Sequence, residues 1–170
     1  IAARNEIMLA EAVKQIDAAG GEGMYVSADL TDIEGCMAVV GACVENWGGV
    51  DILVNNAGAA GGGDILDLPV EVITDALSLK SYGYLRMAQL VIPHMQKNSW
   101  GRIVNIGVGA GASPGRGNMP TSIANAMVLN TTRALSDAVA GDGIMVNVIN
   151  PGVTNTERAR DIHQARADKA

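Results

Sequence analysis

Cysteine and basic residues are scarce in this sequence. Cys36 and Cys43 are the two cysteines among 170 residues, and they lie seven positions apart in a segment with helical periodicity. That spacing does not indicate a disulfide framework or a metal-binding knuckle, and it fits a reducing compartment. Lysine and arginine number 12 against 18 aspartate and glutamate, for a net charge of −6, and they do not cluster. This balance argues against a surface that binds nucleic acid or an anionic membrane.

Phenylalanine and long apolar runs are also absent. No run approaches the roughly 18 residues that a membrane span needs. The 48% of hydrophobic and 18% of charged residues are typical of a folded, soluble domain rather than a disordered chain. Because no signal peptide is visible, we expect a cytoplasmic location. The chain begins at Ile1 instead of Met, so we expect its natural beginning to lie elsewhere.

Helical and strand patterns alternate along the chain. Strand patterns cover 24–28, 51–55, 101–106 and 144–149, and helical patterns cover 5–19, 31–47, 69–97 and 120–140. Alternation of this kind predicts an α/β fold with a parallel sheet and helices on both faces, in a single domain over 1–170.

The helical segment 31–47 carries apolar residues at intervals of three and four. Such spacing places them on one side of a helix, so we expect one buried stripe, followed by a stop at Gly48. The stripe comprises Ile33, Met37, Val40, Val44 and Trp47.

Two of the expected strands run directly into glycine-rich loops, at 56–63 and 107–118. Loops of this type place backbone N–H groups at the carboxyl edge of a sheet, where open α/β folds bind nucleotides. The run Gly107–Ala112 imitates a dinucleotide-binding fingerprint, but Pro114 and Gly115 prevent the helix that must follow it. We therefore interpret it as a loop in which backbone approaches a ligand.

Three motifs occur in order: Asp-Ile-Leu-Val-Asn-Asn-Ala-Gly at 51–58, Gly-Arg-Ile-Val-Asn-Ile at 101–106, and Val-Asn-Val-Ile-Asn-Pro-Gly-Val-Thr-Asn-Thr at 146–156. Together they resemble the short-chain dehydrogenase/reductase family over nearly the whole chain, from Ile1 to about Arg160. The resemblance implies a Rossmann-like, doubly wound sheet that binds NAD(P). It also implies hydride transfer between nicotinamide and a carbonyl or alcohol carbon.

The resemblance also implies which residues hold the cofactor. Arg4 matches a position where a basic residue favours the 2′-phosphate of NADP, and Ala3 stands where an acidic residue favours NAD. The alternative is that Arg4 is a solvated helix-start residue. We therefore expect a weak preference for NADP. Adenine, ribose and carboxamide contacts match Asp29, Leu30, Asn56, Ala57, Gly58, Pro151, Gly152, Val153 and Thr156. For Asn55 and Asn56, bracing of adjacent strands is an equal alternative.

The catalytic positions of the family are all substituted. The family uses an Asn, a Ser and a Tyr-Lys pair in which the lysine lowers the pKa of the tyrosine. The aligned residues here are Ser78, Val108, Thr121 and Asn125. A threonine beside a neutral asparagine has no usable acidity near pH 7, and valine cannot donate a hydrogen bond. Tyr82 and Tyr84, near Lys80 and Arg86, are either a replacement acid or packing residues.

The chain also lacks segments that the resemblance implies. The family's sheet begins with a strand and a glycine-rich turn that lie in the middle of the sheet. Without that strand, the first two strands would separate from the other three and leave two unpaired edges. We therefore expect a preceding βα unit of about 30 residues and a final strand after Ala170.

Two functions remain open at this point. One is an NAD(P)-dependent oxidoreductase with a diverged active site, acting on a small carbonyl or alcohol. The other is a catalytically inactive binding or assembly protein on the same fold. Either is expected to form a homodimer or homotetramer through helices 69–97 and 120–140, where small residues permit close approach. No metal is expected, because His94 and His163 lack partners at ligand spacing.

Overall fold

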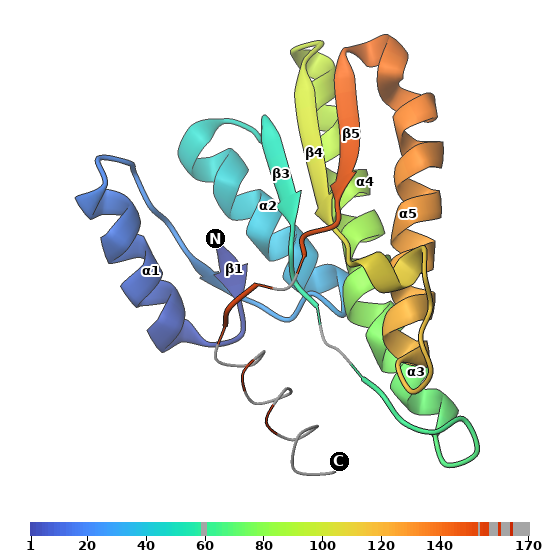
Figure 1. Ribbon diagram of the computed structural model, residues 1–170. Coiled ribbons are helices and arrows are strands. Elements are labelled where there is room, and N and C mark those ends of the chain that lie inside the picture. Colours follow the sequence, from blue (N-terminus) through green and yellow to red (C-terminus); the bar gives the residue numbers. More distant parts are fainter. Residues whose placement is uncertain (59–60, 153, 157–159, 161–163, 165–170) are drawn as a thin grey trace.

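The computed structural model describes residues 1–58, 61–152, 154–156, 160 and 164 (Figure 1). Its strands are β1 (Ala2–Ala3), β2 (Val26–Ser27), β3 (Ile52–Asn55), β4 (Gly101–Ile106) and β5 (Ile144–Ile149). Its helices are α1 (Glu6–Ala18), α2 (Ile33–Trp47), α3 (Val70–Ala76), η1 (Leu77–Tyr82), α4 (Gly83–Lys97), η2 (Gly109–Gly111), α5 (Met119–Val139) and η3 (Ala140–Asp142). The alternating order and the parallel pairing are those predicted for a Rossmann-like fold.

The strands form two separate sheets. β1 pairs with β2 in one, and β3, β4 and β5 pair in that order in the other, all in parallel. Each of β1 and β3 therefore has an edge without strand partners among the described residues. This separation is the one expected when a central strand is missing.

The core lies on one face of the three-stranded sheet. Leu53, Ile103 and Val146 stand in register across the three strands and are buried together. They pack against α4 residues such as Val91 and Met95, both with no exposed surface. On the other face, Ile52, Val54, Met145 and Ile149 are all more than half exposed.

The predicted buried stripe of α2 is only partly correct. Val40 is buried, but Ile33, Met37 and Trp47 are 40–56% exposed, and Cys36 is buried in their place. Val44 of the predicted stripe is partly buried against the core, as is Val39. The face of α2 that meets the core is therefore shifted toward Cys36 and Val39 relative to the predicted stripe. Gly48 ends the helix in a left-handed conformation, as expected.

The long helix expected over 69–97 is interrupted. α3 and α4 are joined by the π-helical segment η1, which carries one extra residue per turn. Ser81 fixes this segment to α5, because its hydroxyl donates a 3.0 Å hydrogen bond to the carbonyl of Ala124. The π segment lies beside the loop after β3, where the candidate site is found.

Candidate functional site

A cavity of about 770 Å³ lies between the unpaired edges of β1 and β3. Its lining includes six of the ten predicted cofactor positions, namely Arg4, Asp29, Leu30, Asn56, Ala57 and Gly58. They come from three places distant in sequence, each following the carboxyl end of a strand, and they meet at this cavity although β1 and β2 belong to a different sheet from β3. Figure 1 shows β1 and β3 in the two separate sheets.

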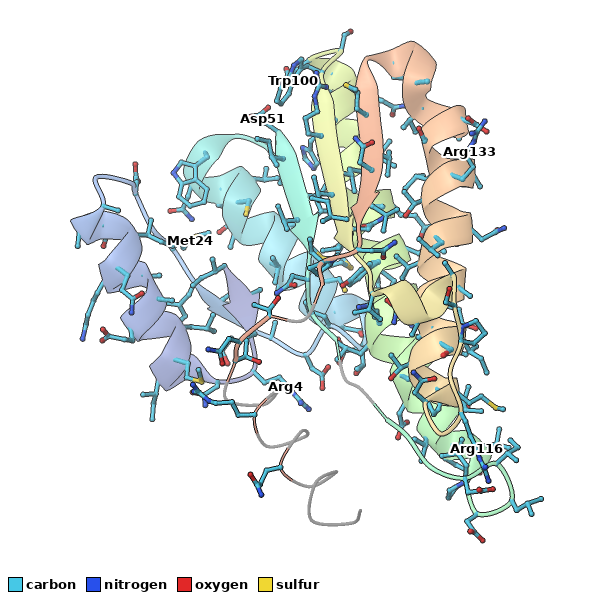
Figure 2. All side chains as sticks on the ribbon, in the orientation of Figure 1. Arg4, Met24, Asp51, Trp100, Arg116 and Arg133 are labelled. Carbon is cyan, nitrogen blue, oxygen red and sulfur yellow. The ribbon has the colours of Figure 1, made fainter. Side chains whose placement is uncertain are left out.

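Asp29 is the acidic group of the cavity. One carboxylate oxygen accepts a 2.9 Å hydrogen bond from the N–H of Thr31. Hydrogen bonds from Thr31, with a smaller contribution from the charge of Arg4, lower the pKa of Asp29 below its usual value. The cavity therefore offers an ionised acceptor beside the Arg4 guanidinium, which is exposed (Figure 2).

Asn55 lines the cavity, but it is buried and its amide is bonded to other core groups. Its amide donates to Asn105 Oδ1 at 2.9 Å and to the carbonyl of Tyr84 at 3.4 Å. Asn105 in turn donates to Thr132 Oγ1 at 2.9 Å. This chain links β3, β4 and α5, so the bracing role considered for Asn55 is the one that these contacts support, whereas Asn56 is exposed.

Thr121 and Asn125 lie one turn apart on α5, and the side-chain donor of each is already bonded to a backbone carbonyl. The Thr121 hydroxyl donates to the carbonyl of Gly61 at 3.1 Å, and the Asn125 amide donates to the carbonyl of Thr121 at 2.7 Å. Asn125 Oδ1 is buried without a hydrogen-bond partner. Val108 follows β4 and is half-buried. None of these three side chains offers an acidic proton.

Ser78 does not join this group by any contact that the structure records. Its hydroxyl donates to the carbonyl of Thr31 at 3.4 Å, on the loop before α2. Its own carbonyl accepts from Arg86. Ser78 therefore ties η1 to the side of the cavity formed by the β2–α2 loop.

Tyr84 and Tyr82 differ in their surroundings near this site. The Tyr84 hydroxyl donates to the carbonyl of Ile106 at 3.2 Å, and burial raises its pKa far above the usual value. Tyr82 is 43% exposed, with the Arg86 guanidinium 5.9 Å from its ring centre. Of the two alternatives considered from the sequence, packing is the one that fits Tyr84.

Lys80 is a residue that the sequence reasoning passed over. It lies in η1, is only 8% exposed, and has its ammonium 5.8 Å from the centre of the Tyr84 ring. Burial lowers its pKa below the usual value for lysine. The signal available in the sequence was a lone charge within the otherwise uncharged run 76–85.

Pro151 and Gly152 follow β5 and are exposed, as is Thr156. They do not line the cavity, and Val153 lies outside the described residues. The part of the chain that the structure describes contains no group of three potential metal ligands. No helix among the described residues is long and apolar enough to span a membrane.

Comparison with known proteins agrees with this architecture. The family model for short chain dehydrogenases matches residues 1–167. A putative ketoacyl reductase of Streptomyces coelicolor is 33% identical over 170 residues, 99% of this chain and 65% of its own. The 3-oxoacyl-(acyl-carrier-protein) reductase FabG of Vibrio cholerae is 30% identical over 147 residues, 86% of this chain and 60% of its own.

Solved structures show the same fold. A short-chain dehydrogenase from Streptomyces avermitilis superposes with a TM-score of 0.84 at 28% identity, covering 92% of this chain and 56% of that one. An NAD+-bound xylitol dehydrogenase superposes with a TM-score of 0.93 at 24% identity, covering 98% of this chain and 65% of that one. The chain belongs to the short-chain dehydrogenase family. It spans 60–65% of the length of the two curated relatives named above.

Proposed function

We propose that this protein is an NAD(P)-dependent oxidoreductase that interconverts a carbonyl and an alcohol. The observation that carries the proposal is the single cavity shared by six predicted cofactor positions. Its lining suits a nucleotide: Leu30 offers an apolar surface for a base, Asp29 an ionised acceptor, and Ala57 and Gly58 leave backbone accessible. When bound, reduced nicotinamide would supply the hydride.

The two curated relatives point to a substrate class. Both are named as ketoacyl or 3-oxoacyl reductases. We therefore propose reduction of a 3-oxoacyl thioester and expect the protein to oxidise NADPH when acetoacetyl-N-acetylcysteamine is added. Steady-state absorbance of NADPH measures this turnover. A rate equal to that of a protein-free blank would count against an oxidoreductase of this specificity.

The proposed preference for NADP depends on Arg4. Replacing Arg4 by Asp should shift the ratio of NADPH to NADH affinities about tenfold toward NADH, because a cation near a 2′-phosphate becomes an anion. Fluorescence titration with each nucleotide measures the ratio. Arg133→Asp is the control, since Arg133 lies on α5 away from the cavity (Figure 2). If the affinity ratio shifts equally in the two variants, Arg4 does not contact the 2′-phosphate and is a solvated helix-start residue.

The proposed extent of the natural protein is larger than these 170 residues. A βα unit before Ile1 would place a strand between β1 and β3, where both edges are unpaired, and this strand would fill the part of the cavity between them. The nucleotide is therefore proposed to lie at the carboxyl ends of the strands, against the loops that follow β1, β2 and β3. A final strand after Ala170 is proposed from the resemblance to the family. The intact mass of the protein from its natural source is expected to exceed 17.5 kDa. A measured mass of 17.5 kDa would contradict the extension.

An inactive binding or assembly protein is the second candidate function. It is favoured by the donors of Thr121 and Asn125, which are already bonded to backbone carbonyls. Saturable nucleotide binding without turnover of any carbonyl in a broad panel would favour it over an enzyme. A cytoplasmic location is proposed for both candidates from the cysteine usage.

Self-association is proposed through α3–α4 and α5, which correspond to the predicted helices 69–97 and 120–140. Tyr82 and Ile123 on these elements are 43% and 38% exposed, which leaves apolar surface for a second copy. Light scattering at micromolar concentration should give the mass of a dimer or tetramer. A monomer mass would contradict this proposal.

A further inference from the structure

The cavity reaches from one sheet to the other. Residues 1–3, which include β1, line one side of it, and residues 52–55, which form β3, line the other. Among the described residues, no strand lies between these two edges. We call the part of the cavity between β1 and β3 the strand slot. An unpaired strand edge is a template for pairing with a further strand, and here two such edges line one cavity.

The edge of β3 presents backbone groups to the strand slot. Along a strand, the N–H and C=O groups of successive residues point alternately to the two sides. The N–H of Arg102 in β4 donates to the carbonyl of Asp51, so Asp51 points toward β4. Ile52 is the next residue and Val54 lies two positions further on. The N–H and C=O groups of both therefore point into the slot.

The edge of β1 presents backbone groups from the opposite side. The N–H of Val26 donates to the carbonyl of Ile1, and the N–H of Ala28 donates to the carbonyl of Ala3. Ile1 and Ala3 therefore point toward β2, and the N–H and C=O groups of Ala2 point into the strand slot. An extended segment between the two edges can form hydrogen bonds with both of them.

The side chains along the strand slot are apolar. The wall formed by α2 and α4 carries Val39, Val40, Cys43, Met87 and Val91. The charged side chains of the cavity lining are Arg4 and Asp29, which follow β1 and β2 and so lie at the carboxyl ends of these strands. A segment buried between the edges must therefore be rich in apolar side chains, as strands covered on both faces are.

We propose that the strand slot binds one extended apolar segment, which forms a strand hydrogen-bonded to both β1 and β3. Its natural occupant is the segment that precedes Ile1 in the natural protein, and the slot of the 170-residue chain accepts a separate peptide of the same chemistry. This inference does not rest on nucleotide binding, because the nucleotide is proposed to lie against the loops at the carboxyl ends of the strands.

The exposed face of the three-stranded sheet supports this occupant. β3, β4 and β5 follow one another across the sheet, and the connecting helices α4 and α5 pack on its buried face. A link from the slot to β1 runs the opposite way across the sheet, and a right-handed crossover that runs this way places its helix on the other face. That face carries Ile52 and Val54 beside the slot, 57% and 56% exposed. A strand and helix before Ile1 would fill the slot and cover these side chains.

Cys43 reports whether the strand slot is occupied. Its side chain lines the slot and is half-buried, whereas Cys36 is fully buried. The test adds the peptide acetyl-Lys-Thr-Val-Ala-Val-Ile-Thr-Lys-amide to the 170-residue chain and follows alkylation of Cys43 by iodoacetamide with mass spectrometry. Alkylation should slow in proportion to the fraction of slots filled and stop at saturation. The same peptide with N-methyl groups at alternate residues keeps its apolar side chains but cannot pair with one of the edges, so it should not protect Cys43.

Val54→Pro and Val148→Pro compare the slot with the other free edge of the same sheet. Proline removes an N–H, and the N–H of Val54 points into the slot, so no hydrogen bond to β4 is lost. The carbonyl of Ile149 accepts from the N–H of Gly107 after β4, so Val148 points away from β4. Val54→Pro should weaken peptide binding about tenfold, and Val148→Pro should leave it unchanged. Fluorescence anisotropy of the labelled peptide measures both affinities, and circular dichroism checks that both variants are folded.

The outcomes are distinct. Saturable protection of Cys43 that is lost with the N-methylated peptide supports the proposal, even if Val54→Pro does not fold. Binding without protection of Cys43, or equal binding of the two peptides, overturns it. Cys43 that is unreactive in the free chain and becomes reactive on dilution would show that a second copy fills the slot, which also overturns it.

The natural protein tests the assigned occupant. In the protein from its natural source, Cys43 should be unreactive without any added peptide, because the segment before Ile1 already fills the slot. A reactive Cys43 in that protein would overturn the assignment. Failure of the chain to bind NADPH would contradict the proposed function alone, since none of these readouts depends on the nucleotide.

Discussion

Gly35→Ala should destabilise the protein by about 1–3 kcal/mol, the usual range for overpacking a tight site. Gly35 lies in the first turn of α2, and an added Cβ would overlap the carbonyl oxygen of Asp29 and approach Asp32 Oδ1 to 3.0 Å. Neither oxygen moves easily. The Asp29 oxygen belongs to the backbone beside the cavity, and Asp32 Oδ1 caps α2 by accepting a hydrogen bond from the N–H of Gly35. The loop from Asp29 to Thr31 must therefore shift, and nucleotide affinity should fall as well.

Gly41→Ala provides the matched control on the same helix. An added Cβ at Gly41 meets nothing within 4 Å, so the gain in helix propensity of about 0.5–1 kcal/mol should appear as higher stability. Urea denaturation of the two variants measures both effects. Equal free energies of unfolding for Gly35→Ala and Gly41→Ala would show that the contact with Asp29 is not a tight one.

Asn105→Ala should lower the free energy of unfolding by about 2–4 kcal/mol, at least as much as Gly35→Ala. The substitution removes two buried hydrogen bonds and leaves their partners poorly satisfied. Asn105 accepts from Asn55 and donates to Thr132, and all three side chains are about 5% exposed. Asn147→Ala, at an exposed position of β5, should change stability by less than about 0.5 kcal/mol.

A double-mutant cycle with Asn55→Ala isolates the link between the strands. The two substitutions should couple by about 0.5–3 kcal/mol, because each removes the partner of the other. Urea denaturation supplies the four free energies. Strict additivity would mean that the hydrogen bond between Asn55 and Asn105 contributes nothing measurable to the fold.

Strands β4 and β5 were predictable from the sequence. Gly101–Ile106 and Ile144–Ile149 match the structure residue for residue. Each is six residues long, rich in Ile and Val and preceded by glycine or led by one, and these features favour a strand over a helix. The cofactor residues that follow β1, β2 and β3 were placed by resemblance, and six of them share the cavity.

The rest depended on contacts that a sequence does not display. The break in helix 69–97 comes from one extra residue in a turn around Lys80, and local propensity is the same for an α or a π turn there. The burial of Cys36 in place of Met37 depends on which face of α2 meets α4. Likewise, Ser78 and Lys80 are two residues apart, yet one contacts the β2–α2 loop and the other Gly58.

The central claim is that the loops after β1, β2 and β3, which line one cavity, bind a nicotinamide nucleotide, and a titration of NADPH into the protein tests it most directly. Nicotinamide fluorescence should rise to saturation, and Asp29→Ala should weaken binding about tenfold by removing one charged acceptor. Asp137→Ala, which changes an exposed carboxylate on α5, should bind as the wild type does. Absence of saturation, or equal affinities for all three proteins, would contradict the account.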